Sequence, residues 1–155
     1  MEGDQRLFSP QNELEIRNRL SEIVHDVKMV LFANPSRRII LLSGNSGDAA
    51  SEETEKLIRA LAALSDKLKL EVYDPQADPE LARRYGVSEV PALILEGDRD
   101  YGIRYLGTPG GYEFASLLED LISIGKRSSG LSEKSRELVQ SITDPVDLKV
   151  FVTPG

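Results

Sequence analysis

The sequence predicts an α/β protein built around a central mixed sheet. Short apolar runs of strand length alternate with longer segments whose apolar residues recur at the spacing of an amphipathic helix. Clusters rich in Gly, Asn, Asp and Pro separate these segments and predict turns. Two strand–helix units, followed by a hairpin and a closing helix, would place helices on both faces of the sheet.

The first predicted element is a long N-terminal helix. Ser9 is a favourable N-cap, and Pro10 is well tolerated at the first helical position. Apolar residues then recur at helical spacing, and Asn34-Pro35 is expected to end the helix. These apolar residues are Ile16, Leu20, Ile23, Val24, Val27, Val30 and Leu31.

The next stretch is predicted to organise the rest of the fold. Residues 39–42 form an apolar run that predicts a buried strand, and residues 43–47 have the composition of a turn. Asp48 would then cap a helix whose first turn carries Glu52 and Glu53, as the helix dipole favours. A buried strand that leads into a helix N-terminus is where α/β folds usually place functional groups.

The following elements are a strand and a short helix. Residues 68–72 alternate apolar and polar side chains, which predicts a half-buried strand. Asp78 is expected to cap a helix with Pro79 at its first position, and Gly86 is expected to end it.

A hairpin comes next. Residues 90–95 predict a strand that has Pro91 near its start, and residues 97–100 predict a turn. The returning strand alternates apolar and polar residues over 101–105, and the glycines and proline of 107–111 end it.

The last part of the chain predicts two helices and a strand. Apolar residues between Phe114 and Ile122 predict a strongly amphipathic helix. After a linker rich in Ser and Gly, residues 138–142 indicate another helix, and residues 147–152 indicate a final strand.

Composition narrows the possible functions. The 155-residue chain has a net charge of −7, so neither nucleic acid nor an anionic membrane is an expected partner. It has no cysteine, which excludes disulfides, thiol catalysis and cysteine-ligated metals. No apolar run approaches the ~20 residues that span a bilayer, and the first residues lack the features of a signal peptide. We therefore expect a cytoplasmic protein.

Several segments resemble the N-terminal unit of two-unit, glutaredoxin-like protein disulfide oxidoreductases. They are LSDKL at 64–68, LARRY at 81–85, VPA at 90–92, YGIRY at 101–105 with Gly107, Pro109, Gly111 and Glu113-Phe114 after it, and VFVTP at 150–154. A related pattern occurs in the N-terminal fold of the flavoprotein reductase that serves alkyl hydroperoxide peroxidases. The resemblance implies a thioredoxin-like fold with a mixed four-stranded sheet flanked by helices, an extra N-terminal helix and a C-terminal helix–strand appendage.

In this family a Cys-x-x-Cys motif begins the helix after the first strand. The resemblance places the motif at residues 48–51, where this chain has Asp48 and Ser51. Disulfide exchange needs a thiolate and a second, resolving thiol. The resemblance therefore implies a redox-inactive unit, from which no catalysis, metal or cofactor is expected. From capping preferences alone, Asp48 and Ser51 are a helix cap and a polar first-turn residue.

A role in binding polypeptide would survive the loss of the cysteines. Proline cannot donate a hydrogen bond to a sheet, and at a strand's start it sometimes follows a cis bond. The backbone of Val90 could pair with an extended polypeptide, which needs no thiol. We therefore expect a peptide-binding site made of Val90, Pro91, Gly47 and Asp48.

The resemblance also predicts how the chain is divided. Residues 1–127 would form the thioredoxin-like unit, and residues 128–155 a linker, a helix and the first strand of a second unit. The expected partners are a polypeptide substrate or redox partner protein and that second unit. Because strand 147–152 would lack its neighbours, we expect it to add to the sheet edge or to pair two chains as a homodimer.

Other interpretations have less support. A stand-alone adaptor that docks a redox partner is the main alternative function. The Gly44-x-x-Gly47 spacing lacks the lysine of a phosphate loop, and His25 has no nucleophile pattern near it. The acidic residues at 96–100 lack the flanking ligands of a calcium loop, so a solvated turn is expected there.

Overall fold

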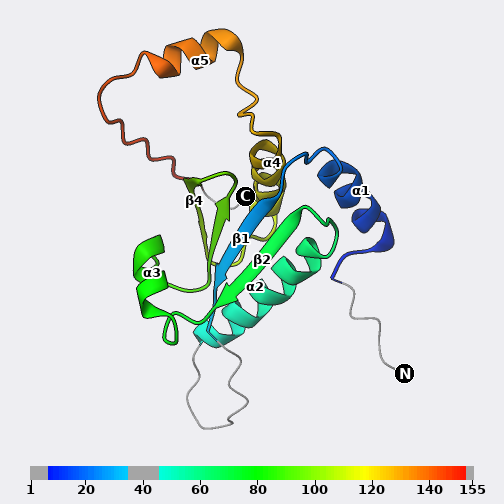
Figure 1. Cartoon of the computed structure of the whole chain (residues 1–155). Coiled ribbons are helices and arrows are strands. Elements are labelled where there is room, and N and C mark those ends of the chain that lie inside the picture. The colour runs from blue at the N-terminus through cyan, green and yellow to red at the C-terminus, as the bar shows by residue number, and fades with distance from the viewer. Residues whose placement is uncertain (1–6, 35–45, 153–155) are drawn as a thin grey trace, which may run out of the picture.

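The computed structural model describes residues 7–34 and 46–152, with only the backbone described for 46–48. Within these residues the chain forms five helices and four strands (Figure 1). In order they are α1 (Pro10–Leu20), β1 (Val27–Phe32), α2 (Ser46–Ala62), β2 (Leu68–Tyr73), α3 (Pro79–Tyr85), β3 (Ala92–Glu96), β4 (Asp100–Leu106), α4 (Tyr112–Lys126) and α5 (Glu133–Gln140).

The strands form one mixed sheet in the order β2-β1-β3-β4. Strand β1 pairs parallel with β2 in a register that sets Val27 opposite Leu68. It pairs antiparallel with β3, and β3 pairs antiparallel with β4, with an irregularity between Leu95 and Glu96. The predicted thioredoxin-like arrangement with a mixed four-stranded sheet is therefore confirmed.

Helices cover both faces of the sheet. Met29 and Leu31 of β1 belong to a core that also holds buried residues of α1, α2 and α4. Val30 and Phe32 belong to a second, smaller core against α3. Burial of each large apolar side chain contributes about 1.5–3 kcal/mol, so the three-helix face provides most of the hydrophobic stabilisation. The cores contain Ile16, Leu20, Ile58, Leu61, Leu117 and Leu121 on the first face and Ala82, Leu81, Tyr85, Ala92 and Ile94 on the second.

The prediction of one long N-terminal helix is wrong. Helix α1 ends at Leu20, and Val27–Phe32 is the central strand β1. Four consecutive residues of this strand, from Met29 to Phe32, are buried, because α3 covers one of its faces and the other helices cover the opposite face. A strand buried on both faces shows no alternation, so its apolar positions also fit a helix. The predicted strand at 39–42 lies outside the described residues.

Helix α2 begins at Ser46, so Asp48 is the third helical residue and not the predicted N-cap. An acidic residue in the first turn is still favoured by the helix dipole. The other boundaries differ less from the prediction. Strand β3 begins at Ala92, directly after Pro91, and Gly86 ends α3 in the left-handed conformation with φ of 68°.

The C-terminal segment differs most from the prediction. Residues 147–152 form no strand and do not add to the sheet edge, and their apolar side chains are exposed. Leu148 is 83% exposed and Phe151 is 90% exposed. Figure 1 shows α5 projecting from the end of α4 on an arm, which we define as residues 128–152. A strand needs a neighbouring strand for its hydrogen bonds, and no strand of the described sheet pairs with this segment.

Candidate functional site

The predicted site lies at the end of the sheet where β1 ends and β3 begins. Phe32 of β1 is opposite Ala92 of β3, so Pro91 lies close to the carboxyl end of β1. At this end the hydroxyl of Ser51 is completely buried and accepts a hydrogen bond from the backbone N–H of Asn34, at 3.2 Å. Ser51 therefore fixes the beginning of α2 against the end of β1.

A second buried hydroxyl extends this connection. Thr54 is completely buried, and its Oγ1 is 2.7 Å from Oγ1 of Thr108, in the loop between β4 and α4. The adjacent Gly107 donates its N–H to the carbonyl of Pro91, at 2.9 Å. These bonds connect α2, the loop after β4 and the proline loop to one another.

Thr54 and Thr108 were not identified from the sequence. A signal for Thr54 exists, because Ser51, Thr54 and the buried Ile58 are spaced three and four residues apart on one helix face. Polar residues on the inner face of an amphipathic helix require buried partners. Nothing in the sequence indicates that the partner is Thr108.

The bond between Val90 and Pro91 is cis. Pro91 is buried and Val90 is half-buried. Among the described residues, no hydrogen bond is formed by the N–H or the carbonyl of Val90. For Gly47 and Asp48 the structure describes only the backbone. The structure therefore brings Ser51 and Pro91 to one end of the sheet, where no described residue bonds to the backbone N–H or carbonyl of Val90.

The described residues bring no base to Ser51. His25 is exposed and precedes β1, at the opposite end of that six-residue strand from Asn34. At 3.3 Å per residue the strand alone separates the two ends by about 20 Å. Ser51 is hydrogen-bonded to a backbone amide, and a buried hydroxyl without a base is not an activated nucleophile.

Charged side chains on the α3 face of the sheet are paired with one another. Nζ of Lys28 is 3.0 Å from Glu71 and 3.7 Å from Glu96. The hydrogen bond to Glu71 raises the pKa of Lys28, and the same bond lowers the pKa of Glu71. Burial, followed by a hydrogen bond to Glu96, raises the pKa of Tyr85. These groups form a cross-strand network that stabilises the sheet.

The acidic side chains at the β3–β4 hairpin also have hydrogen-bond partners within the hairpin. Asp98 accepts a hydrogen bond from the hydroxyl of Tyr101. Asp100 is 2.6 Å from Arg104, and this bond holds the pKa of Asp100 at about 2. Within the described ranges, three or more potential metal ligands never gather at one point.

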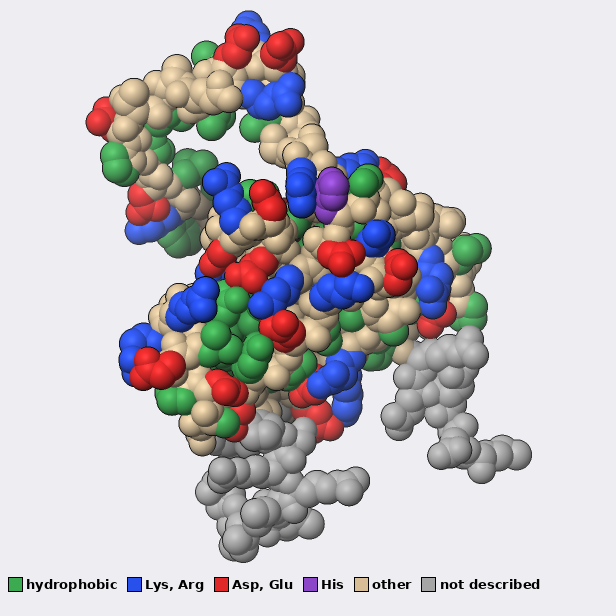
Figure 2. All heavy atoms as spheres, in the orientation of Figure 1, with side chains coloured by type: hydrophobic (Ala, Val, Ile, Leu, Met, Phe, Trp, Pro, Cys, Tyr) green, Lys and Arg blue, Asp and Glu red, His purple; other side chains and the backbone are tan. Residues whose placement is uncertain are grey.

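Charges of both signs are interspersed over the face of the molecule shown in Figure 2. None of the helices in the described part of the chain is long and apolar enough to span a membrane.

The sequence and the fold of this chain were compared with those of known proteins. No known protein-family profile matches the chain. It is 28% identical over 118 residues to the alkyl hydroperoxide reductase AhpF of Xanthomonas campestris pv. phaseoli, a match that covers 75% of this chain and 20% of that protein.

Solved structures show the same fold. The crystal structure of a protein disulfide oxidoreductase from Aeropyrum pernix K1 matches with a TM-score of 0.69 and 26% identity, over 86% of this chain and 54% of that one. The alkyl hydroperoxide reductase AhpF of Enterococcus faecalis matches with a TM-score of 0.72 and 19% identity, over 86% and 60% of the two chains. Its N-terminal domain gives a TM-score of 0.70 at 20% identity.

The chain thus has a thioredoxin-like fold related to these disulfide oxidoreductase and reductase N-terminal domains. It spans a little over half of each solved chain and a fifth of the curated relative.

Proposed function

We propose that this chain is a redox-inactive thioredoxin-like half of a protein of the disulfide oxidoreductase type, which holds polypeptide and supports a second unit. One observation carries the proposal. A thioredoxin-like fold related to disulfide oxidoreductases occurs here in a chain without cysteine, and a buried, hydrogen-bonded Ser51 occupies the position that the resemblance assigns to the second cysteine.

The chemistry of the site supports redox inactivity. Thiol–disulfide exchange passes through a mixed disulfide that a second thiol must resolve. Neither the carboxylate of Asp48 nor the hydroxyl of Ser51 forms a disulfide. Ser51 instead has a structural role, because its hydroxyl binds the N–H of Asn34.

Polypeptide binding is supported by the backbone beside Pro91. The N–H and carbonyl of Val90 form no hydrogen bond within the described chain. An extended polypeptide could satisfy both groups by adding as a strand, a mode of recognition that depends on the main chain. This interaction needs none of the missing thiols.

The second unit is supported by a repeat within the chain. Ser9 and Ser132 both cap a helix by accepting a hydrogen bond from the N–H three residues later. After α1 comes DVKMVL at 26–31, and after α5 comes DLKVFV at 147–152, with aspartate and lysine at the same positions. The first copy becomes the central strand β1, whereas the second copy lies exposed on the arm. This repeat supports the proposal that the arm supplies a helix and a central strand to another sheet.

An insulin-reduction assay tests redox inactivity. We expect this chain to give no turnover above the dithiothreitol background, whereas D48C/S51C gains turnover because it restores a motif at a helix N-terminus. The single variant D48C is the matched control, since it has no resolving thiol. Turnover by the chain without substitutions would overturn the proposal. If the D48C/S51C chain folds but forms no disulfide, the family's Cys-x-x-Cys motif does not correspond to residues 48–51.

Titration with a reduced, carboxymethylated polypeptide, followed by NMR, tests the binding role. We expect the amide resonance of Val90 to shift while those of α5 do not. Unchanged resonances around Val90 at saturating polypeptide would contradict binding at this end of the sheet.

A further inference from the structure

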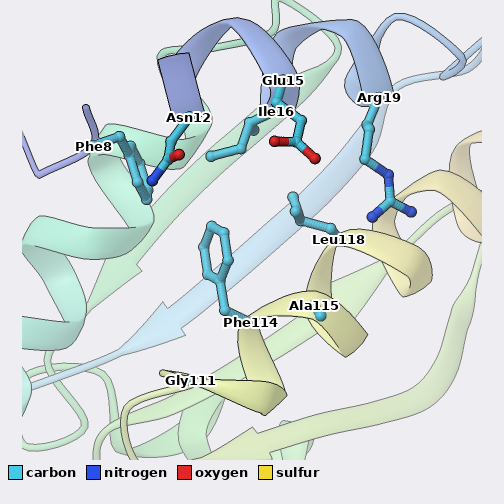
Figure 3. Close-up of a pocket in the computed structure, with 9 residues that line it drawn as sticks. All are labelled: Phe8, Asn12, Glu15, Ile16, Arg19, Gly111, Phe114, Ala115 and Leu118. Carbon is cyan, nitrogen blue, oxygen red and sulfur yellow. The ribbon is translucent and has the colours of Figure 1, made fainter. Parts of the chain in front are cut away.

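A hollow of about 330 Å³ lies between α1 and α4, and its lining includes neither Val90 nor Pro91 (Figure 3). Its walls are mainly apolar, and the rings of Phe8 and Phe114, which both line it, lie 5.5 Å apart. Ile16 and Leu118 add aliphatic surface, and exposed Ala115 leaves the opening wide. An open groove between two helices, with aromatic and aliphatic walls, suits the apolar side chains of a third helix.

The rim of the hollow carries two charged side chains from α1. Arg19 lines the hollow but forms an ion pair with Glu119 of α4. Glu15 also lines it, and within the described part of the chain Glu15 has no ion pair. Figure 3 shows Glu15 and Arg19 extending from α1 on the same side of the hollow. A partner would therefore meet an apolar floor beside a carboxylate on a protein of net charge −7.

We propose that this hollow docks an amphipathic helix of a partner protein, with lysine or arginine beside its apolar stripe. The apolar stripe would enter between Phe114 and Ile16, and the basic side chain would pair with Glu15. Apolar contacts would supply most of the affinity, whereas the charge would select the partner and increase the rate of encounter. The proposal is independent of the redox-inactive role, because it uses none of the residues around Val90.

Two helical peptides with the same leucine stripe at i, i+3, i+4 and i+7 test the proposal. One carries lysines beside the stripe and the other carries glutamates. Each is titrated into the full chain, and binding is followed by NMR. We expect the lysine peptide to bind more tightly and to shift resonances of α1 and α4.

The variant E15Q should weaken binding of the lysine peptide by up to about fivefold, the effect of losing an exposed ion pair. E53Q is the matched control, since Glu53 is an exposed carboxylate on α2.

Two further variants separate the apolar and charged contributions. A115W fills the hollow and should weaken binding about tenfold, as expected for loss of a central anchor. S116W, on the next and exposed residue of α4, is the control. E15K should reverse the preference between the two peptides. Equal binding of both peptides, or an A115W chain that binds normally, would overturn the proposal. If A115W instead shifts the resonances of α5, the chain's own arm fills the hollow and the proposal is wrong.

Discussion

At the level of single residues, buried hydroxyls determine how the site end of the sheet is held. Thr54 and Thr108 are 54 positions apart in sequence, yet their hydroxyls share a hydrogen bond inside the protein. Such a bond contributes modestly to stability when intact, but an unsatisfied buried partner is costly. Removal of one hydroxyl should therefore cost more than removal of both.

Thr54→Val tests this asymmetry. We expect a loss of about 1 kcal/mol in the free energy of unfolding, because valine has the shape of threonine but leaves the hydroxyl of Thr108 without its partner. The double variant T54V/T108V should recover most of this loss, whereas Thr54→Ser keeps the hydroxyl and should lose only the ~0.8 kcal/mol of one buried methyl group. Urea unfolding of the unsubstituted chain, T54V, T108V and T54V/T108V measures the coupling between the two hydroxyls. Strictly additive losses would contradict the pairing.

The ion pair of Asp100 predicts a dependence on pH. The hydrogen bond with Arg104 lowers the pKa of Asp100 from 3.8 to about 2. A depressed folded-state pKa stabilises the fold above pH 3.8, and this contribution is lost as the pH falls toward about 2. Because Asp100 is 36% exposed, solvent screening limits the effect to less than about 1 kcal/mol. Urea unfolding of D100N should show a shallower loss of stability over this range than the unsubstituted chain.

At the level of helices and strands, one glycine sets how closely α4 approaches the chain between α1 and β1. The carbonyl of Gly125 accepts hydrogen bonds from the N–H groups of Val24 and His25. A Cβ at Gly125 would lie 2.5 Å from Cγ2 of Ile23, too close for any side chain without a shift. This position therefore requires glycine for packing, in spite of the low helix propensity of glycine.

Gly125→Ala should destabilise the fold by about 1–3 kcal/mol, because the clash with Ile23 outweighs the gain in helix propensity of about 1 kcal/mol. In the background of Ile23→Ala the same substitution should become neutral or stabilising. Thermal unfolding of the two single variants and the double variant checks this change of sign. An equal loss in both backgrounds would show that the crowding lies elsewhere.

At the level of the complete chain, the arm is the part whose apolar side chains the fold leaves exposed. Leu148, Val150 and Val152 alternate along 147–152, and all three are exposed. Exposed apolar strands pair with other chains or aggregate. Because the described sheet gains no strand from this segment, pairing between two chains through 147–152 stays a prediction of the sequence.

The double variant L148K/V150K should reduce self-association, because it places two charges on the apolar side of the arm. S141K/T143K adds the same charges at exposed polar positions and is the control. Sedimentation velocity over a range of concentrations measures the effect. If the unsubstituted chain remains a monomer at high concentration, the predicted homodimer is wrong.

Local sequence patterns were enough to predict the fold class, the β3–β4 hairpin, and the helices α3 and α4. These features depend on signals within one segment, such as the amphipathic spacing of α4 and the glycine that ends α3. For the predicted site, the proline at the start of a strand indicated Val90 and Pro91, and the family resemblance indicated Ser51. The structure places these residues at one end of the sheet.

The identity of β1 was settled by tertiary contacts, because a strand covered on both faces has no alternating pattern. Tertiary contacts also pair Thr54 with Thr108, since hydrogen bonds between distant segments leave no local signal. Tertiary contacts also determine whether residues 147–152 form a strand. The same kind of sequence forms β1 between two neighbouring strands but forms no strand and is exposed on the arm, because a strand is stabilised by its neighbours.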